Sequence, residues 1–586
     1  MDSILINFWY FGIAAPSVLM LIDRVKLNKK ERVTDATTYV WALLSLIAVL
    51  PIFGFLSAIV AGSFPLVAIL FYVASGLGAM TIFSYLMRGG SQKVDEIKHD
   101  FTMRPELERN KKTDIRTVSS MLPKAGEKFD PRDYFDKEKG LFIGLDENKK
   151  PVYTNYEDWL ISHALLTGRT RSGKGVAAQI MLSQAIDRGE YVVALDPKVD
   201  NWMPHIFREQ CERSGVPYRY LDLRQSAGPQ INIFEGCDFE TIENMLVGGF
   251  SLTEKGTDAD FYKLADRKAA RRCARFLADN PGSTARDALA KFGGFWSEEC
   301  AAFHAYMEEL AEIPALNLSS GGYNVADGEK TGGCLYVVGD MINTRIIRMQ
   351  RMILLRMLFL AKNRDQMQSG HRTITVLADE FKVHISRPFI MSLGASAGWG
   401  LHVILAFQSL QDLADVPADL DKDAVRGSVN ENCAIALSYA IKDPETREWV
   451  AASTGKILVD DETRTVDKNI MLAETVDSER SIRQAERFFI DENMLKAMPK
   501  GCGVLAKAGE LEKFIYTSPV PAVRVREAIT PTYPASPGAQ KPAARSTPPA
   551  EKTEVDLFAD SQQISPPADL TKSVAESAID IPDIDD

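Results

Sequence analysis

Residues 163–176 read HALLTGRTRSGKGV, and this stretch decides the fold. Its apolar start, 163–167, is typical of a buried strand, and a glycine-containing loop follows at once. Residues 176–188 are predicted to form a helix, and 191–195 (YVVAL) the next buried strand. Strand, glycine loop, helix and strand make a βαβ unit, which predicts a parallel sheet and an α/β fold.

The glycine loop fits the Walker A spacing GxxxxGK. Its glycines let the backbone curl so that N–H groups point at phosphate oxygens, and the helix that begins there adds the positive end of its dipole. The lysine places a point charge on the β- and γ-phosphates. The predicted ATP-binding residues are Gly168, Arg169, Thr170, Arg171, Ser172, Gly173, Lys174, Gly175 and Val176.

Position 175 departs from the standard motif. It holds glycine where a Ser or Thr hydroxyl ordinarily binds Mg²⁺. We therefore expect Mg²⁺ to depend more on Asp379 and on water molecules. Slow hydrolysis, or a platform regulated by nucleotide, is an alternative.

Residues 373–380 read TITVLADE, a buried strand that ends in two carboxylates. Adjacent acids at a strand end are often only solvated, but after a Walker A loop they fit a Walker B motif. Asp379 is then predicted to hold the Mg²⁺ shell, directly or through water, and Glu380 to polarise the attacking water. Together with Lys174, these acids and Gln408 are the predicted catalytic residues.

Two further strand ends belong to the prediction. Gln408 ends the strand VILAFQ, where its amide either senses the γ-phosphate and orients water or simply caps the strand. Asp196, Pro197 and Lys198 end the strand after the P-loop helix. Because strand carboxyl ends line the ligand crevice of open α/β sheets, these residues are predicted to face nucleotide or a neighbouring subunit.

The composition limits the number of domains and the kinds of site that the chain can contain. It has 586 residues, a net charge of −11, 46% hydrophobic and 25% charged residues, which indicates two or three domains with appendages. A basic field over the whole protein is excluded, so any nucleic-acid site is a local patch. The seven cysteines form no Cys-x-x-Cys pair, which argues against a disulfide framework or zinc site and suits a reducing cytosol.

Three apolar runs without charged residues open the chain, at 4–22, 39–62 and 65–87. Each reaches the roughly 20 residues that a membrane-spanning helix needs. The loop 23–38 holds five Lys or Arg residues, which favours the cytoplasmic side and leaves everything after residue 88 inside. We expect a transmembrane anchor over 1–87, although the first run alternatively lies in the interface, leaving two spanning helices.

The remaining domain boundaries follow from changes in composition and pattern along the sequence. Residues 88–135 are predicted to be a polar linker, 136–237 and 326–526 an α/β nucleotide-binding domain, and 238–325 an all-α domain. Residues 527–586 are rich in proline and carry four Lys or Arg against eleven Asp or Glu. Such a tail cannot bury enough apolar surface to order itself, so we expect disorder. Its end, 578–586, is either a partner-docking peptide or a solubilising acidic segment.

The motifs TGRTRSGKGVA, VALDPK, VLADEF, ILAFQSLQDL and LKAMPKGCGVLAKAG occur in this order. With the membrane anchor, they resemble the type IV secretion coupling proteins, the conjugative-transfer ATPases related to RecA-like DNA pumps. A branch of that family carries glycine after the P-loop lysine. The chain departs from the family in its three candidate membrane helices, where two are usual, and in lacking the glycine and acid that commonly follow DPK.

The resemblance implies a RecA-like P-loop NTPase domain with an all-α insertion, using ATP and Mg²⁺. It implies a homo-hexamer in the bacterial inner membrane, with the bulk of the chain cytoplasmic. The expected partners are relaxase-bound single-stranded DNA, protein substrates, or both, together with components of a type IV secretion channel. A double-stranded DNA pump and a weakly hydrolysing cargo receptor are the alternatives.

Basic residues suggest two further roles. Within 261–276, Arg267, Arg271 and Arg275 lie four apart on one helix face, which either grips phosphates or is a solvated or interface surface. An arginine that reaches a neighbouring subunit's γ-phosphate is also expected. The sequence leaves its choice open among Arg345, Arg348, Arg351, Arg356, Arg426 and Arg447.

Overall fold

The described part of the chain in this computed structural model comprises residues 115, 118–124, 126–224, 227–254, 256, 259–365, 367–368, 370–468 and 474–533. The apolar runs before residue 88 and the tail after 533 lie outside these residues, so their predicted states stay predictions. Among the helices that the structure does describe, none combines the length and apolarity needed to cross a bilayer.

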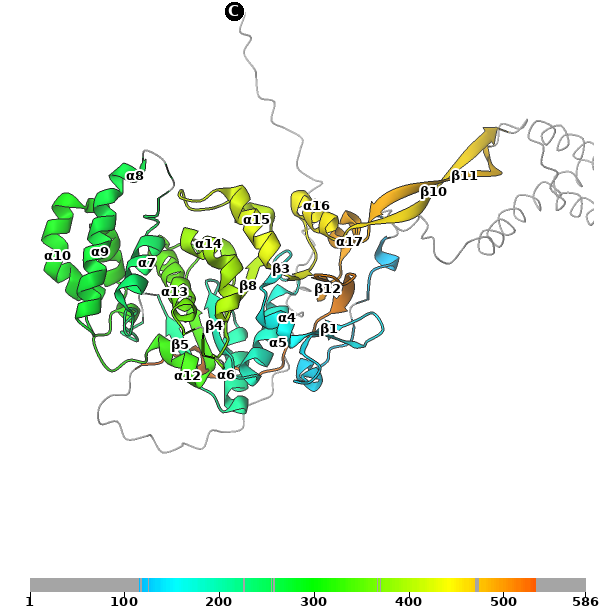
Figure 1. The fold of residues 1–586 in the computed structure, drawn as a ribbon. Helices are drawn as coiled ribbons and strands as arrows, with labels where there is room; N and C mark the ends of the chain where they lie inside the picture. Colours follow the sequence, from blue (N-terminus) through cyan, green and yellow to red (C-terminus); the bar gives the residue numbers. More distant parts are fainter. Residues whose placement is uncertain are drawn as a thin grey trace, which may run out of the picture. The chain divides into compact units, whose positions relative to one another are not determined.

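The larger of two compact units is Lys111–Ile457 with Glu486–Asp586, and an eleven-stranded sheet forms its centre (Figure 1). The strand order is β2-β1-β13-β12-β9-β3-β8-β7-β4-β6-β5. The bounds are β1 (Leu141–Leu145), β2 (Pro151–Thr154), β3 (Ala164–Thr167), β4 (Tyr191–Asp196), β5 (Tyr218–Asp222), β6 (Gly333–Val338), β7 (Ile374–Ala378), β8 (Leu401–Phe407), β9 (Ile435–Ser438), β12 (Cys502–Lys507) and β13 (Lys513–Tyr516).

The seven strands from β9 to β5 pair in parallel, which confirms the predicted α/β class. Strands β3, β4, β6, β7 and β8 are buried along their whole length because helices cover both faces. The helices of this unit are α4 (Tyr156–Leu160), α5 (Lys174–Asp187), α6 (Met203–Ser214), α7 (Phe239–Gly249), α8 (Ala259–Tyr262), α9 (Leu264–Asp279), α10 (Ala285–Glu299), α11 (Ala301–Ala311), α12 (Gly328–Thr331), α13 (Thr344–Lys362), α14 (Arg387–Ser396), α15 (Lys422–Asn432), α16 (Pro444–Ser453) and α17 (Glu492–Ala497).

Two apolar cores lie on opposite faces of the sheet. Because successive side chains of a strand alternate, Val193 and Leu195 of β4 join the core built with α7, α13 and α14. Val192 and Ala194 join the core built with α5 and α6. The P-loop helix α5 is thereby fixed on one face while its first turn stays at the carboxyl edge of the strands.

The other end of the sheet is antiparallel. Strands β2, β1, β13 and β12 pair antiparallel with one another, and β12 pairs antiparallel with β9. Sequence analysis did not predict β5 or β13. Both are short, and β5 reads YRYLD and β13 KFIY, so their polar residues hide the apolar pattern.

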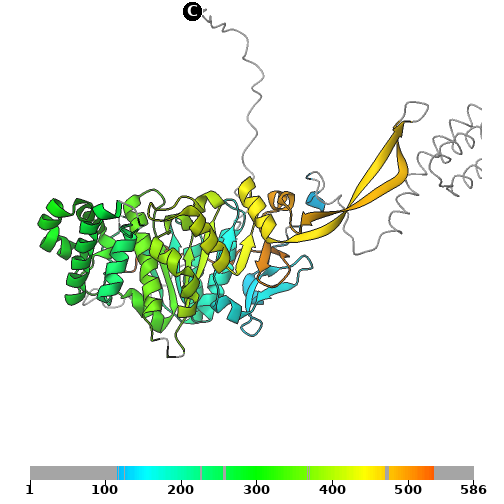
Figure 2. The ribbon, with the colours of Figure 1, turned by 45° about the horizontal axis from the view of Figure 1, so that its top comes forward.

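Helices α7 to α11 follow β5 in the chain and precede β6, and they gather at one end of the larger unit (Figure 2). Trp296 and Phe303 meet edge to face in their core. Helix α7 packs against both α9 and α13. The apolar core therefore runs without a break from the sheet into these helices.

The described residues at the end of the predicted linker and at the start of the predicted tail pack against the sheet. In the predicted linker, Phe129 packs against Phe142 and Tyr516. At the start of the predicted tail, the Tyr218 hydroxyl donates to Ala528 O at 2.8 Å, and Thr532 N donates to Tyr220 O at 2.9 Å. Strand β5 is the edge of the sheet, and the second bond uses a backbone oxygen that no neighbouring strand pairs.

Over its described residues, the smaller unit contains most of the strands β10 (Lys456–Lys468) and β11 (Glu474–Phe488). The two strands pair with each other as a separate two-stranded sheet. Alternating charged residues along both strands left no apolar period in the sequence, and neither strand was predicted.

Candidate nucleotide-binding site

The glycine loop follows β3 and leads directly into α5. Gly168 and Gly173 both have φ of 142°, which side chains rarely tolerate. A Cβ at Gly173 would lie 2.4 Å from Cε1 of Tyr439, and one at Gly168 would lie 2.8 Å from Cβ of the same tyrosine. Tyr439 follows β9, is fully buried, and its hydroxyl lies 3.0 Å from Thr517 Oγ1. The tyrosine ring therefore sets the inner wall of the loop.

Lys174 begins α5 and is buried under the loop. Its ammonium donates to the backbone oxygens of Gly168 and, at 3.2 Å, Arg169. Burial lowers the pKa of Lys174 to about 8, and the charge of Lys198 acts in the same direction. The charges of Asp379, Glu380 and Asp412 oppose that shift. A buried ammonium is poorly solvated, so it gains by binding phosphate oxygens.

The other predicted loop residues divide by exposure. Arg169, Thr170 and Arg171 are exposed, whereas Ser172 and Val176 are buried. The Ser172 hydroxyl donates to Arg169 O at 2.7 Å and closes the turn. The Arg169 N–H donates to Ala440 O at 2.8 Å, and the Ser172 N–H donates to Arg169 O at 3.3 Å.

Gln408 joins the loop to the Walker B acids. Thr170 Oγ1 donates to Gln408 Oε1 at 2.8 Å, and Gln408 Nε2 donates to Glu380 Oε1 at 2.6 Å. This bridge exists because β8 lies between β3 and β7, so the residue after β8 stands between their carboxyl ends. The structure thus brings Lys174, Asp379, Glu380 and Gln408 together at one edge of the sheet.

Asp379 and Glu380 have different surroundings. Burial raises the pKa of Asp379, an effect that the charge of Lys198 opposes. Glu380 has φ of 49° and ψ of 62°, and its Oε2 atom is buried without a hydrogen-bond partner. An orphaned carboxylate oxygen in this position fits a site that accepts a water molecule or another polar group.

Lys198 takes a larger part than the sequence indicated. Its ammonium lies 2.5 Å from Glu380 Oε1 and 3.3 Å from Asp379 Oδ2. Burial alone would lower the pKa of Lys198, but these two carboxylates raise it above its usual value. The only sequence signal was its position just after a strand end, in Asp-Pro-Lys.

The described residues contain no group of three or more His, Cys, Asp or Glu side chains that could hold a metal ion by themselves. Mg²⁺ is usually held by one or two carboxylates together with phosphate oxygens and water. Asp379 suits that role. At Gly175, an added Cβ would meet only Met203 Cε, at 3.8 Å, so the missing hydroxyl is not explained by lack of space.

The candidate arginines already have partners within the chain. Arg356 is buried, donates to Glu235 O at 2.6 Å, and has its pKa lowered to about 10 by burial, so it cannot reach another subunit. Arg351 donates to Val383 O at 3.1 Å. The remaining candidates pair at Arg345–Glu312, Arg348–Glu309 and Arg426–Glu445, and Arg447 donates to Lys442 O.

The basic face of α9 is partly neutralised. Arg267 pairs with Glu254, and Arg271 lies 3.9 Å from Glu243. Arg271 and Arg275 both stack over the ring of Phe239. These contacts favour a solvated or interface surface over a free phosphate grip within the described part of the helix.

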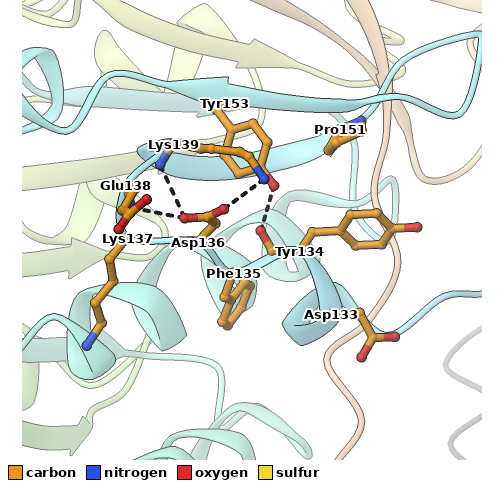
Figure 3. Close-up of a pocket in the computed structure, with 9 residues that line it drawn as sticks. All are labelled: Asp133, Tyr134, Phe135, Asp136, Lys137, Glu138, Lys139, Pro151 and Tyr153. Carbon is orange, nitrogen blue, oxygen red and sulfur yellow. Dashed lines mark hydrogen bonds and ion pairs between the residues drawn. The ribbon is translucent and has the colours of Figure 1, made fainter.

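A shallow groove of about 490 Å³ is lined by residues other than the predicted site residues (Figure 3). Its polar groups pair with one another, with Lys139 Nζ 2.8 Å from Asp136 Oδ2 and Tyr153 OH donating to Tyr134 O at 2.9 Å. The lining contains none of the predicted site residues, which argues against a catalytic role.

Comparison with known proteins adds independent information. A family model described as type IV secretory system conjugative DNA transfer matches residues 274–525. Mobilization protein A of Escherichia coli is 28% identical over 330 residues, which are 56% of this chain. The match spans 60% of that relative's length.

A solved structure supports the fold. The bacterial conjugative coupling protein TrwBdeltaN70, in its unbound monoclinic form, matches with a TM-score of 0.50 and 14% identity. The match covers 69% of this chain and 92% of that one. The plasmid coupling protein TrwB in complex with ADP and Mg²⁺ matches with a TM-score of 0.49 and 14% identity, over 70% of this chain and 97% of that one.

Proposed function

We propose, from the premise that this chain is a relative of the type IV secretion coupling proteins, that it is a RecA-like P-loop ATPase. ATP hydrolysis would drive relaxase-bound single-stranded DNA, protein substrates, or both into a type IV secretion channel, as in conjugative transfer. The proposal includes a homo-hexamer anchored in the bacterial inner membrane by residues within 1–87, with the bulk of the chain cytoplasmic.

The bridge from Thr170 through Gln408 to Glu380 carries the enzymatic part of this proposal. It means that the P-loop and the acid that would orient water belong to one polar network. A phosphate held by the loop backbone and Lys174 would therefore lie beside Glu380. General-base or water-positioning roles require contact of this kind.

The chain's own residues fit a nucleotide with Mg²⁺. Asp379 offers a carboxylate, Glu380 has an unpartnered buried oxygen, and Lys174 offers a buried ammonium at the start of α5. When bound, Mg²⁺ would neutralise phosphate charge. Asp379 would position it, Gln408 would hold Glu380, and the loop N–H groups would fix the phosphates.

The anchor and the cargo rest on other observations. The absence of charge from 4–22, 39–62 and 65–87 supports the membrane segments. The family match over 274–525 and the similarity to Mobilization protein A support a role in DNA transfer.

The test measures ATP hydrolysis by the full-length chain in detergent, with and without single-stranded DNA. We expect Lys174→Ala and Glu380→Gln each to lower turnover by about 10²-fold or more, because each removes a group that acts in phosphoryl transfer. Glu380→Gln should still bind nucleotide, whereas Lys174→Ala should bind it weakly. Lys513→Ala is the matched control for a single charge removal, because Lys513 is half exposed and pairs with Glu510 at 3.1 Å, outside this network.

Two results would contradict the proposed function. Nucleotide binding without turnover, at any DNA concentration, would favour a cargo receptor that uses nucleotide for assembly. Stimulation by double-stranded but not single-stranded DNA would favour a duplex pump. Equal turnover in wild type and Glu380→Gln would remove the assigned role of that acid.

A further inference from the structure

A lysine ammonium occupies the space between the two Walker B carboxylates. Lys198 Nζ lies 2.5 Å from Glu380 Oε1 and 3.3 and 3.4 Å from the two oxygens of Asp379. Glu380 is almost completely buried, with 1% of its side chain exposed, while Lys198 keeps 34%. Two adjacent carboxylates in a buried edge repel each other, and this ammonium compensates both.

The turn that carries Lys198 is fixed from below. Asp196, buried at the end of β4, accepts from Lys198 N at 2.9 Å and from Asp200 N at 2.6 Å. The Tyr336 hydroxyl donates to the same carboxylate at 2.6 Å. The backbone is therefore held in place, and only the side chain of Lys198 is free to move.

Backbone strain lies on both sides of the ion pair. Val199, next to Lys198, has φ of 61°, and Glu380 has φ of 49°. A non-glycine residue in this region costs about 1–3 kcal/mol, and strain of this kind gathers at functional sites. The backbone beside the ammonium and at the carboxylate therefore keeps a conformation that costs free energy.

Hydrogen bonding around Glu380 is one-sided. Its Oε1 atom takes both the Lys198 ammonium and the Gln408 amide, while its Oε2 atom is buried with no partner. The pair therefore leaves capacity for another ligand on the same carboxylate. A flexible four-carbon side chain can withdraw toward solvent without moving the turn.

We propose that Lys198 competes with the divalent cation of the nucleotide for Asp379 and Glu380, so that cation binding requires the lysine side chain to swing away. The physical reason is like-charge repulsion, because an ammonium within about 3 Å of both carboxylates and a divalent cation on either one cannot coexist at full strength. The inference rests on the proposed function, and it adds an internal cation that sets how tightly Mg²⁺ is held.

The test uses the full-length chain and a fluorescent ATP analogue at fixed concentration, with Mg²⁺ titrated. In Lys198→Gln we expect the Mg²⁺ concentration for half-maximal binding to fall about tenfold, which corresponds to about 1.4 kcal/mol. Lys198→Arg keeps the positive charge and should stay near wild type. Lys362→Gln is the matched control, because Lys362 has a similar exposure, 39% against 34%, and pairs with Glu240 at 3.3 Å, away from the site.

A second measurement is independent of nucleotide. Binding of Mn²⁺ alone, followed by electron paramagnetic resonance, should be tighter in Lys198→Gln than in wild type. Lys198→Ala repeats both measurements if the glutamine variant does not fold. An unchanged or raised half-maximal Mg²⁺ concentration, or unchanged Mn²⁺ binding, would overturn the competition.

The failures are distinguishable. Weaker analogue binding in Lys198→Gln at every Mg²⁺ concentration would assign Lys198 to phosphate binding instead. If wild type binds no analogue with or without Mg²⁺, the proposed function fails, and the Mn²⁺ comparison still decides the competition.

Discussion

Replacing Gly173 by alanine should destabilise the fold, whereas the same change two residues later should not. An added Cβ at Gly173 would lie 2.4, 2.8 and 2.9 Å from three ring atoms of Tyr439, which is fully buried. The backbone there has φ of 142° and ψ of −8°. Strain of about 1–3 kcal/mol and overpacking of about 1–3 kcal/mol together predict a loss of about 2–6 kcal/mol.

Gly175 provides the contrast. It lies inside α5, is exposed, and an added Cβ would meet only Met203 Cε at 3.8 Å. Alanine at such a helical position is better than glycine by about 0.5–1 kcal/mol. The two substitutions therefore add the same methyl group with opposite expected signs.

The assay is urea unfolding of the full-length chain without nucleotide, followed by circular dichroism and repeated by scanning calorimetry. Gly173→Ala should move the midpoint to clearly lower urea, and Gly175→Ala should leave it unchanged or raise it slightly. A Gly173→Ala variant within about 0.5 kcal/mol of wild type, the usual range of surface substitutions, would refute the assignment of Tyr439 as the wall.

Two predictions remain beside the turnover and cation tests. Tyr439→Phe removes the bond to Thr517 Oγ1 and should lower the free energy of unfolding by about 1 kcal/mol, measured in urea; no change would mean that the bond is not formed. Burial lowers the pKa of Lys174 to about 8, so this lysine is charged below pH 8 and neutral above it. Nucleotide affinity should accordingly fall as pH rises from about 7 to 9, by up to about tenfold per pH unit above the pKa, and a flat fluorescence titration over that range would contradict this.

Much of the fold could be predicted from local sequence patterns. The spans expected for β3, β4, β7, β8 and α5 agree with the structure within a residue or two, because each has an apolar period or a fixed loop motif. The strands β5 and β13 were not predicted, because they are short and carry polar residues. The strands β10 and β11 were not predicted because charged residues alternate along their sequences and leave no apolar period.

In the candidate site, too, the local motifs could be predicted and the long-range contact could not. The phosphate-binding glycines and Lys174, and the two acids at the end of β7, were readable because each motif lies within a few consecutive residues. The contact of Lys198 with those acids was not, since it joins residues 181 positions apart in the chain. No spacing rule indicates which lysine of a strand end will turn toward a neighbouring strand.

By itself, the sequence determined that a glycine loop joins a buried strand to a helix and that two carboxylates end another strand, because both are local patterns. Only the tertiary structure decided that β8 separates those strands, that Gln408 therefore bridges loop and acid, and that Tyr439 walls the loop. The reason is that strand order and side-chain contact are set by packing over the whole sheet, which no short stretch of chain encodes.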